Sequence, residues 1–220
     1  MKNVLFICLL LGFTTGLYAQ SIEKPAPANE KFVKAMEKAL AGMDTLKTAE
    51  QWQAKSNVFE RIAQKETGEW LPAYYVGLCQ AMVFNMDQDV SKHEPLCDKI
   101  DQYLSRADSL SPNNSEIYVL RSMAAGMRIR LNPMVNGQKY GPLAGMLIEK
   151  ALKLDPENPR AFMQKGISTF FTPPQWGGSP EKGKELMETA AQKFDSFKPA
   201  SSIHPNWGKE GNERILEMAK

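Results

Sequence analysis

The chain has 220 residues, of which 43% are hydrophobic and 24% charged, and its formal net charge is +2. This composition is typical of a folded globular protein. It argues against a nucleic-acid partner and against binding to a membrane surface through basic residues, because both carry a large positive excess. About two hundred residues are enough for one domain or a short repeat array.

Residues 1–19, MKNVLFICLLLGFTTGLYA, have the layout of a secretory signal peptide. Lys2 precedes an apolar run that is too short to span a bilayer, and small residues lead to a cleavage site near Ala19. Cys8 lies inside the apolar run rather than at its end, which argues against a lipid anchor. We therefore predict an exported chain, periplasmic or secreted, with no stable membrane anchor and with a flexible lead-in at 20–29.

The remaining chain shows no sustained strand alternation, whereas apolar residues recur at helical spacing almost throughout. Asn29 precedes the first apolar stripe as a helix cap. Thr48 and Gln51 have the spacing of a capping box before the second stripe. The fold class is therefore predicted to be all-α.

A repeat of 44 residues organises these helices. Tyr74, Tyr118 and Phe162 are separated by 44 residues each and lie near the starts of apolar segments, and Ala107 and Ala151 recur at the same spacing in the partner helices. We predict a single domain at 30–220 made of antiparallel helical hairpins with a C-terminal capping helix, because the end of a repeat array exposes an apolar face. The predicted hairpins are 30–66, 69–111, 115–155 and 159–197, and the predicted cap is 206–219.

The turns between hairpins share a chemistry. In ALKLDPENPRAFMQKG, Pro156 stops one helix, and Asn158 before Pro159 starts the next. Together with Phe162 and Gly166, this segment resembles the tetratricopeptide repeat (TPR) family. The resemblance implies a right-handed α-solenoid that binds a protein or peptide partner on its concave face.

The sequence also departs from that family. Arg121 and Lys165 replace its first-helix leucine, and the repeats are about ten residues longer than the usual 34, a length within the range of HEAT-type repeats. The excess lies in MDQDVSKHEPLC and RLNPMVNGQKYGP, where longer helices or longer loops would absorb it. The chain is also similar, more weakly, to the periplasmic TPR components of TRAP-type solute transporters.

A phosphate-loop spacing, GxxxxGK, occurs at Gly178, Gly183 and Lys184. A working loop follows a β-strand and ends in Ser or Thr, whereas here a helix precedes it and Glu follows the lysine. Ser179 and Pro180 instead have the pattern of a helix start, and Gly183 falls on the small position of the repeat. We therefore expect no bound nucleotide.

Catalytic residues are scarce. His93 and His204 lie on predicted loops far apart in the sequence, and a zinc site would need more ligands than His93, Glu94 and Cys97 supply. We therefore expect a protein that is not an enzyme and holds no metal or cofactor, although sequence alone cannot pair a serine or cysteine nucleophile with a base.

The first helices of the hairpins predict the binding surface. An apolar stripe on the concave face would suit a partner, and its methionines would make it adaptable, unless the C-terminal tail or the loops between helices cover it as core. The guanidinium groups of Arg121 and Arg128, at one-face helical spacing, are suited to clamp a carboxylate if they face this groove. The predicted partner-binding residues are Tyr75, Met82, Met123, Met127, Met163, Phe170, Arg121 and Arg128.

Two functions follow. The first is a scaffold that binds a protein or peptide. The alternative is a small-ligand carrier or adaptor associated with solute uptake, for which we expect a closed pocket lined by aromatics and by one or more of the central arginines.

Other side chains have two interpretations each. Cys79 and Cys97 form either a disulfide or two buried thiols. Trp70, Trp176 and Trp207 each flank a turn, either as a plug whose indole N–H bonds a loop carbonyl or as a stacking platform.

Overall fold

The computed structural model describes residues 29–219, and every regular element within that range is a helix. The all-α prediction is therefore confirmed. The predicted signal peptide and nearly all of the predicted lead-in lie outside the described residues.

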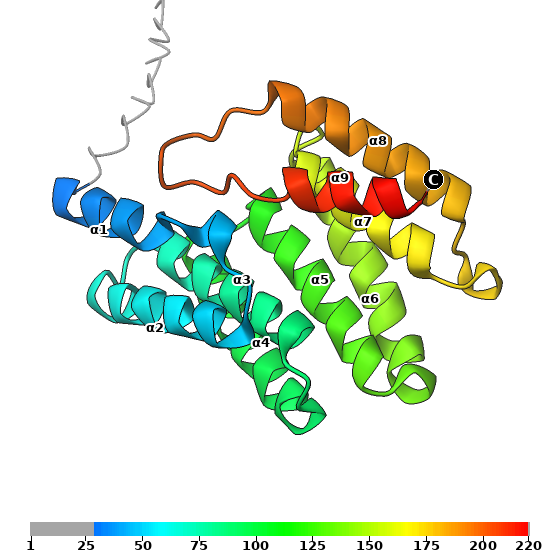
Figure 1. Ribbon diagram of the computed structural model, residues 1–220, viewed down its shortest axis with the longest axis horizontal. Helices are drawn as coiled ribbons and strands as arrows, with labels where there is room; N and C mark the ends of the chain where they lie inside the picture. Colours follow the sequence, from blue (N-terminus) through cyan, green and yellow to red (C-terminus); the bar gives the residue numbers. More distant parts are fainter. Residues whose placement is uncertain (1–28, 220) are drawn as a thin grey trace, which may run out of the picture.

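The helices pair as antiparallel hairpins packed side by side, with a last helix at the end of the row (Figure 1). The pairs are α1 (Glu30–Leu40) with α2 (Ala49–Lys65), α3 (Trp70–Met86) with α4 (His93–Leu110), α5 (Ser115–Leu131) with α6 (Pro133–Leu154), and α7 (Pro159–Phe171) with α8 (Pro180–Ser196). The final helix, α9 (Lys209–Met218), packs against α8 as the predicted cap. Short 3-10 turns occupy Met43–Thr45, Val90–Lys92 and Pro174–Trp176.

The predicted local signals set the helix starts. Asn29 and Asn158 accept hydrogen bonds from backbone N–H groups two residues on, and Thr48 with Gln51 forms a complete capping box. Ser179 caps α8 by accepting from a backbone N–H three residues on. Each cap satisfies a donor that the first helical turn leaves unpaired. The GxxxxGK stretch is therefore a helix start, as its residues predicted.

The extra length of the repeats lies largely in helices. RLNPMVNGQKYGP is mostly part of α6, which begins directly after Asn132 and contains Pro142. The prediction that His93 lies on a loop is wrong, because it is the first residue of α4. Of the two alternatives, longer helices absorb most of the excess, with a 3-10 turn before α4 and the Asn132 cap before α6.

Helix α3 lies at the centre of the larger core. It is buried on nearly all sides, between α2, α4 and α5, which explains why its apolar residues show no single stripe. Small residues allow the close packing of neighbouring helices. A Cβ added to Gly183 in α8 would lie 2.6 Å from the backbone nitrogen of Phe170 in α7, so the small position predicted there is confirmed.

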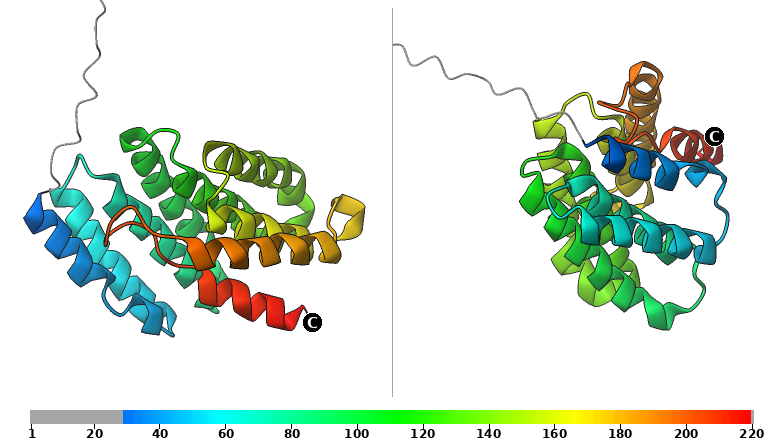
Figure 2. Two further views of the ribbon diagram at one scale, coloured as in Figure 1. Left: turned by 90° about the horizontal axis from the view of Figure 1, so that it is seen from above. Right: turned by 90° about the vertical axis from the view of Figure 1, so that its left-hand side faces the viewer.

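Residues 197–208, called here the C-terminal linker, leave α8, cross the molecule to α1 and return to α9 (Figures 1 and 2). The buried Ile203 accepts a hydrogen bond of 3.1 Å from the Tyr75 hydroxyl through its carbonyl oxygen. Ser202 donates to the carboxylate of Glu37 in α1 at 2.7 Å. The linker therefore covers one end of the apolar stripe on α3.

Candidate functional site

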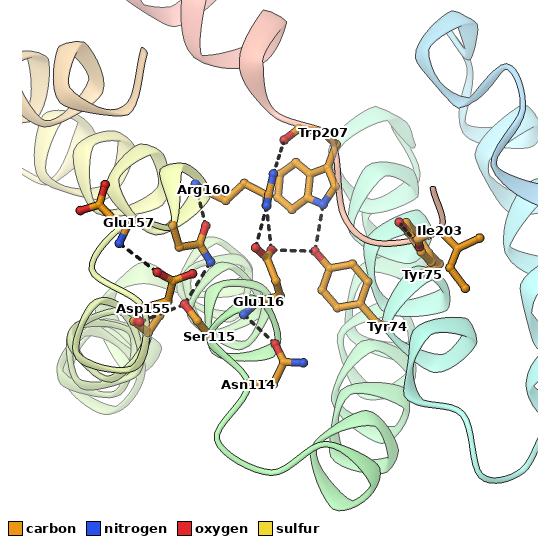
Figure 3. Close-up of polar contacts among 12 residues, drawn as sticks. Tyr74, Tyr75, Asn114, Ser115, Glu116, Asp155, Glu157, Arg160, Ile203 and Trp207 are labelled. Atoms are coloured by element: carbon orange, nitrogen blue, oxygen red, sulfur yellow. Dashed lines mark hydrogen bonds and ion pairs between the residues drawn. The ribbon is translucent and has the colours of Figure 1, made fainter. Parts of the chain in front are cut away.

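A buried polar network joins α3, α5, α7 and the C-terminal linker (Figure 3). The Arg160 side chain is 1% exposed, and its Nε and Nη2 atoms each lie 2.7 Å from a carboxylate oxygen of Glu116. Tyr74 donates to the same carboxylate at 3.4 Å, and the Trp207 indole N–H donates to the Tyr74 hydroxyl at 2.9 Å. We call Tyr74, Glu116, Arg160 and Trp207 the buried clasp.

The charges of the clasp compensate one another. Burial by itself lowers the pKa of Arg160, but the hydrogen bonds and charge of Glu116 outweigh it, so the pKa is raised. Burial, followed by the Glu116 charge, raises the pKa of Tyr74 well above its usual value. Because its ion pair is buried and two of its hydrogen bonds reach Trp207, the clasp holds the C-terminal linker against the helices.

Much of the predicted apolar binding stripe is core. Tyr75 stacks on Phe59 of α2 with ring centroids 5.0 Å apart, and Met163 packs beside Gly208 of the linker. The linker and α2 therefore supply the cover that the sequence left open. Among the predicted partner-binding residues, Tyr75, Met127 and Met163 are buried, and Met82, Met123 and Phe170 are partly exposed.

The two predicted arginines lie elsewhere. An α-helix turns by about 100° per residue, so Arg121 and Arg128 project from the side of α5 opposite to Met123. They face α4 and α6, whereas Met123 packs against the core around α3. The structure thus divides the predicted site into two surfaces.

The arginines line a surface cleft of about 240 Å³ between α4 and α6, with α5 as its floor. It arises because α4 and α6 each pack on α5. The cleft is open to solvent, in contrast to the closed pocket expected of a carrier, and it has one aromatic residue. Its lining residues are Asp101 and Ser105 of α4, Arg121, Ala125 and Arg128 of α5, and Tyr140, Leu143 and Leu147 of α6.

The polar ends of this α4–α6 cleft differ. Arg128 donates to Asp101 at 2.6 and 3.0 Å and to Asp98 at 2.7 Å, and it lies 5.9 Å from the centre of the Tyr140 ring. Burial by itself lowers the pKa of Arg128, but the hydrogen bonds and charges of the two carboxylates outweigh it, so the pKa is raised. Arg121 contacts Asp108 at 3.3 Å.

Sequence reasoning missed the α6 wall of this cleft. Tyr140, Leu143 and Leu147 follow the spacing i, i+3, i+7, which places them on one face of a helix. In an antiparallel neighbour of the helix that carries Arg121 and Arg128, such a face can lie opposite the two arginines. The signal was present, but the chain before Leu143 was assigned to the excess between the two helices. A helix starting at Pro133 brings the aromatic ring into line with the leucines.

The histidines and cysteines lie outside the cleft. His93 contacts the Asp87 carbonyl oxygen at 3.0 Å, and His204 contacts the Ser201 hydroxyl at 2.7 Å. Cys79 and Cys97 are buried free thiols, so the disulfide alternative is not observed. Burial raises the pKa of Cys97 to about 11, which makes its thiol a poor nucleophile. No cluster of metal-ligating side chains occurs in the part of the chain that the structure describes.

The tryptophans have different roles. The Trp207 side chain contacts all three apolar clusters and is a plug as predicted, although its N–H bonds a tyrosine hydroxyl rather than a carbonyl. Trp70 packs edge-on against Tyr74. Trp176 is 63% exposed and plugs nothing. Between residues 29 and 219 we find no helix of the length and apolarity that a bilayer crossing needs.

The fold and the cleft define the protein as an all-α array of helical hairpins with an open surface cleft beside α5. It is similar to a solved structure, the HusA haemophore from Porphyromonas gingivalis, with 30% sequence identity and a TM-score of 0.77 over 86% of this chain and 92% of that chain. At this identity and coverage, the chain belongs to the same family of helical, exported proteins.

No protein-family model matches the chain, and no curated protein matches it. The TPR resemblance and the weaker one to TRAP-transporter components therefore rest on the sequence pattern of the hairpins alone.

Proposed function

We propose that this protein is an exported carrier of a porphyrin-class ligand, with haem as the first candidate, and that the ligand binds in the α4–α6 cleft. The observation that carries the proposal is the 30% identity to a haemophore over nearly the whole of that chain. Export is also what the leader sequence predicts. The function is thus closer to the small-ligand carrier expected as the alternative than to the protein-binding scaffold.

The chemistry of the cleft suits such a ligand. A porphyrin such as haem is a flat, largely apolar ring with two carboxylates at one edge. Ala125, Leu143 and Leu147 supply an apolar surface, Tyr140 an aromatic ring, and the arginines positive charge. A cleft of about 240 Å³ is smaller than the ~300–1,000 Å³ of pockets that enclose ligands, so it would hold one part of the ring and leave the rest accessible.

Histidine would not hold the iron of a haem in this cleft. Both histidines lie elsewhere, and the lining side chains that offer oxygen ligands include Tyr140 and Asp101. Binding would therefore rest mainly on contacts with the ring and its carboxylates, and the iron would travel as cargo. This suits a carrier that must release its ligand, and it requires no catalytic group.

The test is a titration of the mature protein with hemin, followed by the change in visible absorbance. Leu143→Glu places a carboxylate on the apolar wall and should weaken binding by about tenfold or more, because a buried charge is costly. Met146→Glu is the matched control, since Met146 lies on the same helix, is 64% exposed and does not line the cleft. Absence of saturable binding would exclude the function, and equal effects of the two variants would exclude the cleft.

A second candidate function is binding of a protein partner. Exposed apolar side chains gather near the turns within hairpins: Val90, Met134, Val135, Phe171 and Trp176. Such residues are typical of contact surfaces. The test is affinity capture from the envelope fraction with the mature chain, read by mass spectrometry. A partner retained by the wild type and lost with Trp176→Ala would support this function, and a partner retained equally by both would not support this surface.

A further inference from the structure

The two arginines of the α4–α6 cleft are not equivalent. The Arg128 side chain is 13% exposed and is surrounded by two carboxylates at 2.6–3.0 Å. Distances of this size are those of strong charge-assisted hydrogen bonds. The carboxylates of Asp98 and Asp101 already bind the Nε and Nη2 atoms of Arg128, and their negative charges repel another carboxylate that approaches this guanidinium.

Arg121 is held more loosely. Its Nη1 atom lies 3.3 Å from Asp108, and its Nη2 atom donates to the Ser105 hydroxyl at 3.2 Å. Both contacts are longer than the ~2.7–2.9 Å of strong ionic hydrogen bonds. The side chain is 27% exposed, and its Nε–H makes no hydrogen bond to any residue between 29 and 219. Arg121 therefore retains donors for a further acceptor.

The antiparallel pairing of α5 and α6 fixes which wall residue lies near each arginine. Arg128 lies beside Tyr140, and Arg121, two turns earlier on α5, lies at the level of Leu147. Leu143 and Ala125 lie between these levels. A flat acid in the cleft would thus have its carboxylate at one end and its apolar part at the other.

We infer that Arg121, rather than Arg128, is the specificity-determining residue that binds a carboxylate of the ligand, with the apolar part of the ligand directed toward Tyr140. This inference rests on the proposed function. It also gives a role to Asp108, whose carboxylate competes with the ligand for Arg121.

The experiment compares free-base protoporphyrin IX, which has two carboxylates, with its dimethyl ester, which has none. Quenching of tryptophan fluorescence gives the affinity of each. Arg121→Gln should weaken binding of the diacid by about tenfold and leave the diester within about twofold, because only the diacid loses a charge-assisted bond. Asp108→Asn should strengthen binding of the diacid several-fold.

Two further variants show whether the effect on diacid binding is specific to Arg121. Arg130→Gln is the matched control, since Arg130 is on the same helix, bonds Asn85 and does not line the cleft; it should change neither affinity. Arg128→Gln should lower both affinities together, because it disturbs the fold of the cleft. Circular dichroism establishes that each variant is folded. If Arg121→Gln does not fold, the two affinities are measured with Arg121→Lys instead.

The outcomes separate the inference from the proposed function. Equal preference for diacid over diester in the wild type and in Arg121→Gln would overturn the inference, as would a loss of that preference in Arg128→Gln alone. A wild type that binds both porphyrins equally would also overturn it and leave the carrier function intact. If the wild type binds neither, the proposed function is wrong and the inference is wrong with it.

Discussion

The buried clasp allows a direct test of what holds the C-terminal linker in place. Glu116→Gln keeps the size of the side chain and removes its charge. The guanidinium of Arg160, 1% exposed, then stays buried without a counter-ion. Removing one partner of a buried ion pair costs about 3–5 kcal/mol, because the remaining charge is shielded from water and no longer has an opposite charge beside it.

This cost is a large part of a typical stability of about 5–15 kcal/mol. For a domain of about 190 residues, each kcal/mol lowers Tm by about 2–4 °C, so Glu116→Gln should lower Tm by roughly 6–20 °C. The assay is urea and thermal unfolding followed by circular dichroism. Glu149→Gln is the control, because Glu149 pairs with Lys165 at the surface, is 60% exposed and should contribute under about 1 kcal/mol.

A double variant tests whether Glu116 and Arg160 stabilise the fold as a pair. Arg160→Met removes the buried cation, so combining it with Glu116→Gln should be less destabilising than the sum of the two single changes. A loss below about 1 kcal/mol for Glu116→Gln, or simple additivity of the two changes, would refute the view that the ion pair is the core of the clasp.

Three further predictions concern other parts of the molecule. Burial lowers the pKa of His204 below its usual value near 6.5, so the folded state binds fewer protons than the unfolded state. The stability that this shift contributes is therefore present above pH 6.5 and is lost as the pH falls. His204→Gln should flatten this part of a stability profile measured between pH 7 and 5. Gly183→Ala should cost about 2–3 kcal/mol because the new methyl group meets the backbone of α7, whereas Gly145→Ala, with nothing within 4 Å, should be neutral or stabilising in urea unfolding. Titration of the mature chain in denaturant without reductant should find two free thiols, Cys79 and Cys97, and a single bridged pair would contradict the structure.

The helices and their starts could be predicted because their signals are local. Asn29, Thr48, Asn158 and Ser179 cap helices as their sequence neighbours indicated. A cap depends on a side chain and a backbone group two or three residues apart, so few residues of context decide it. The spacing of 44 residues then indicated hairpins, because equal spacing requires equivalent packing.

The candidate site was predicted only in part. Arg121 and Arg128 were grouped correctly by helical spacing, but they were assigned together with Met123 to one groove. Which side of α5 faces the core and which faces the gap between α4 and α6 depends on the packing of three helices. No spacing within α5 alone specifies its neighbours, so Tyr140 and the leucines of α6 were not included.

The sequence by itself determined the helical class, the hairpin period, the helix caps and the small position at Gly183, because each follows from the chemistry of residues close together in the chain. Only the tertiary structure decided that the C-terminal linker covers the stripe on α3, through Trp207 and Ile203, and that an open cleft lies on the other side of α5. The Tyr75–Ile203 hydrogen bond joins residues 128 positions apart, so it exists only once the whole array has formed.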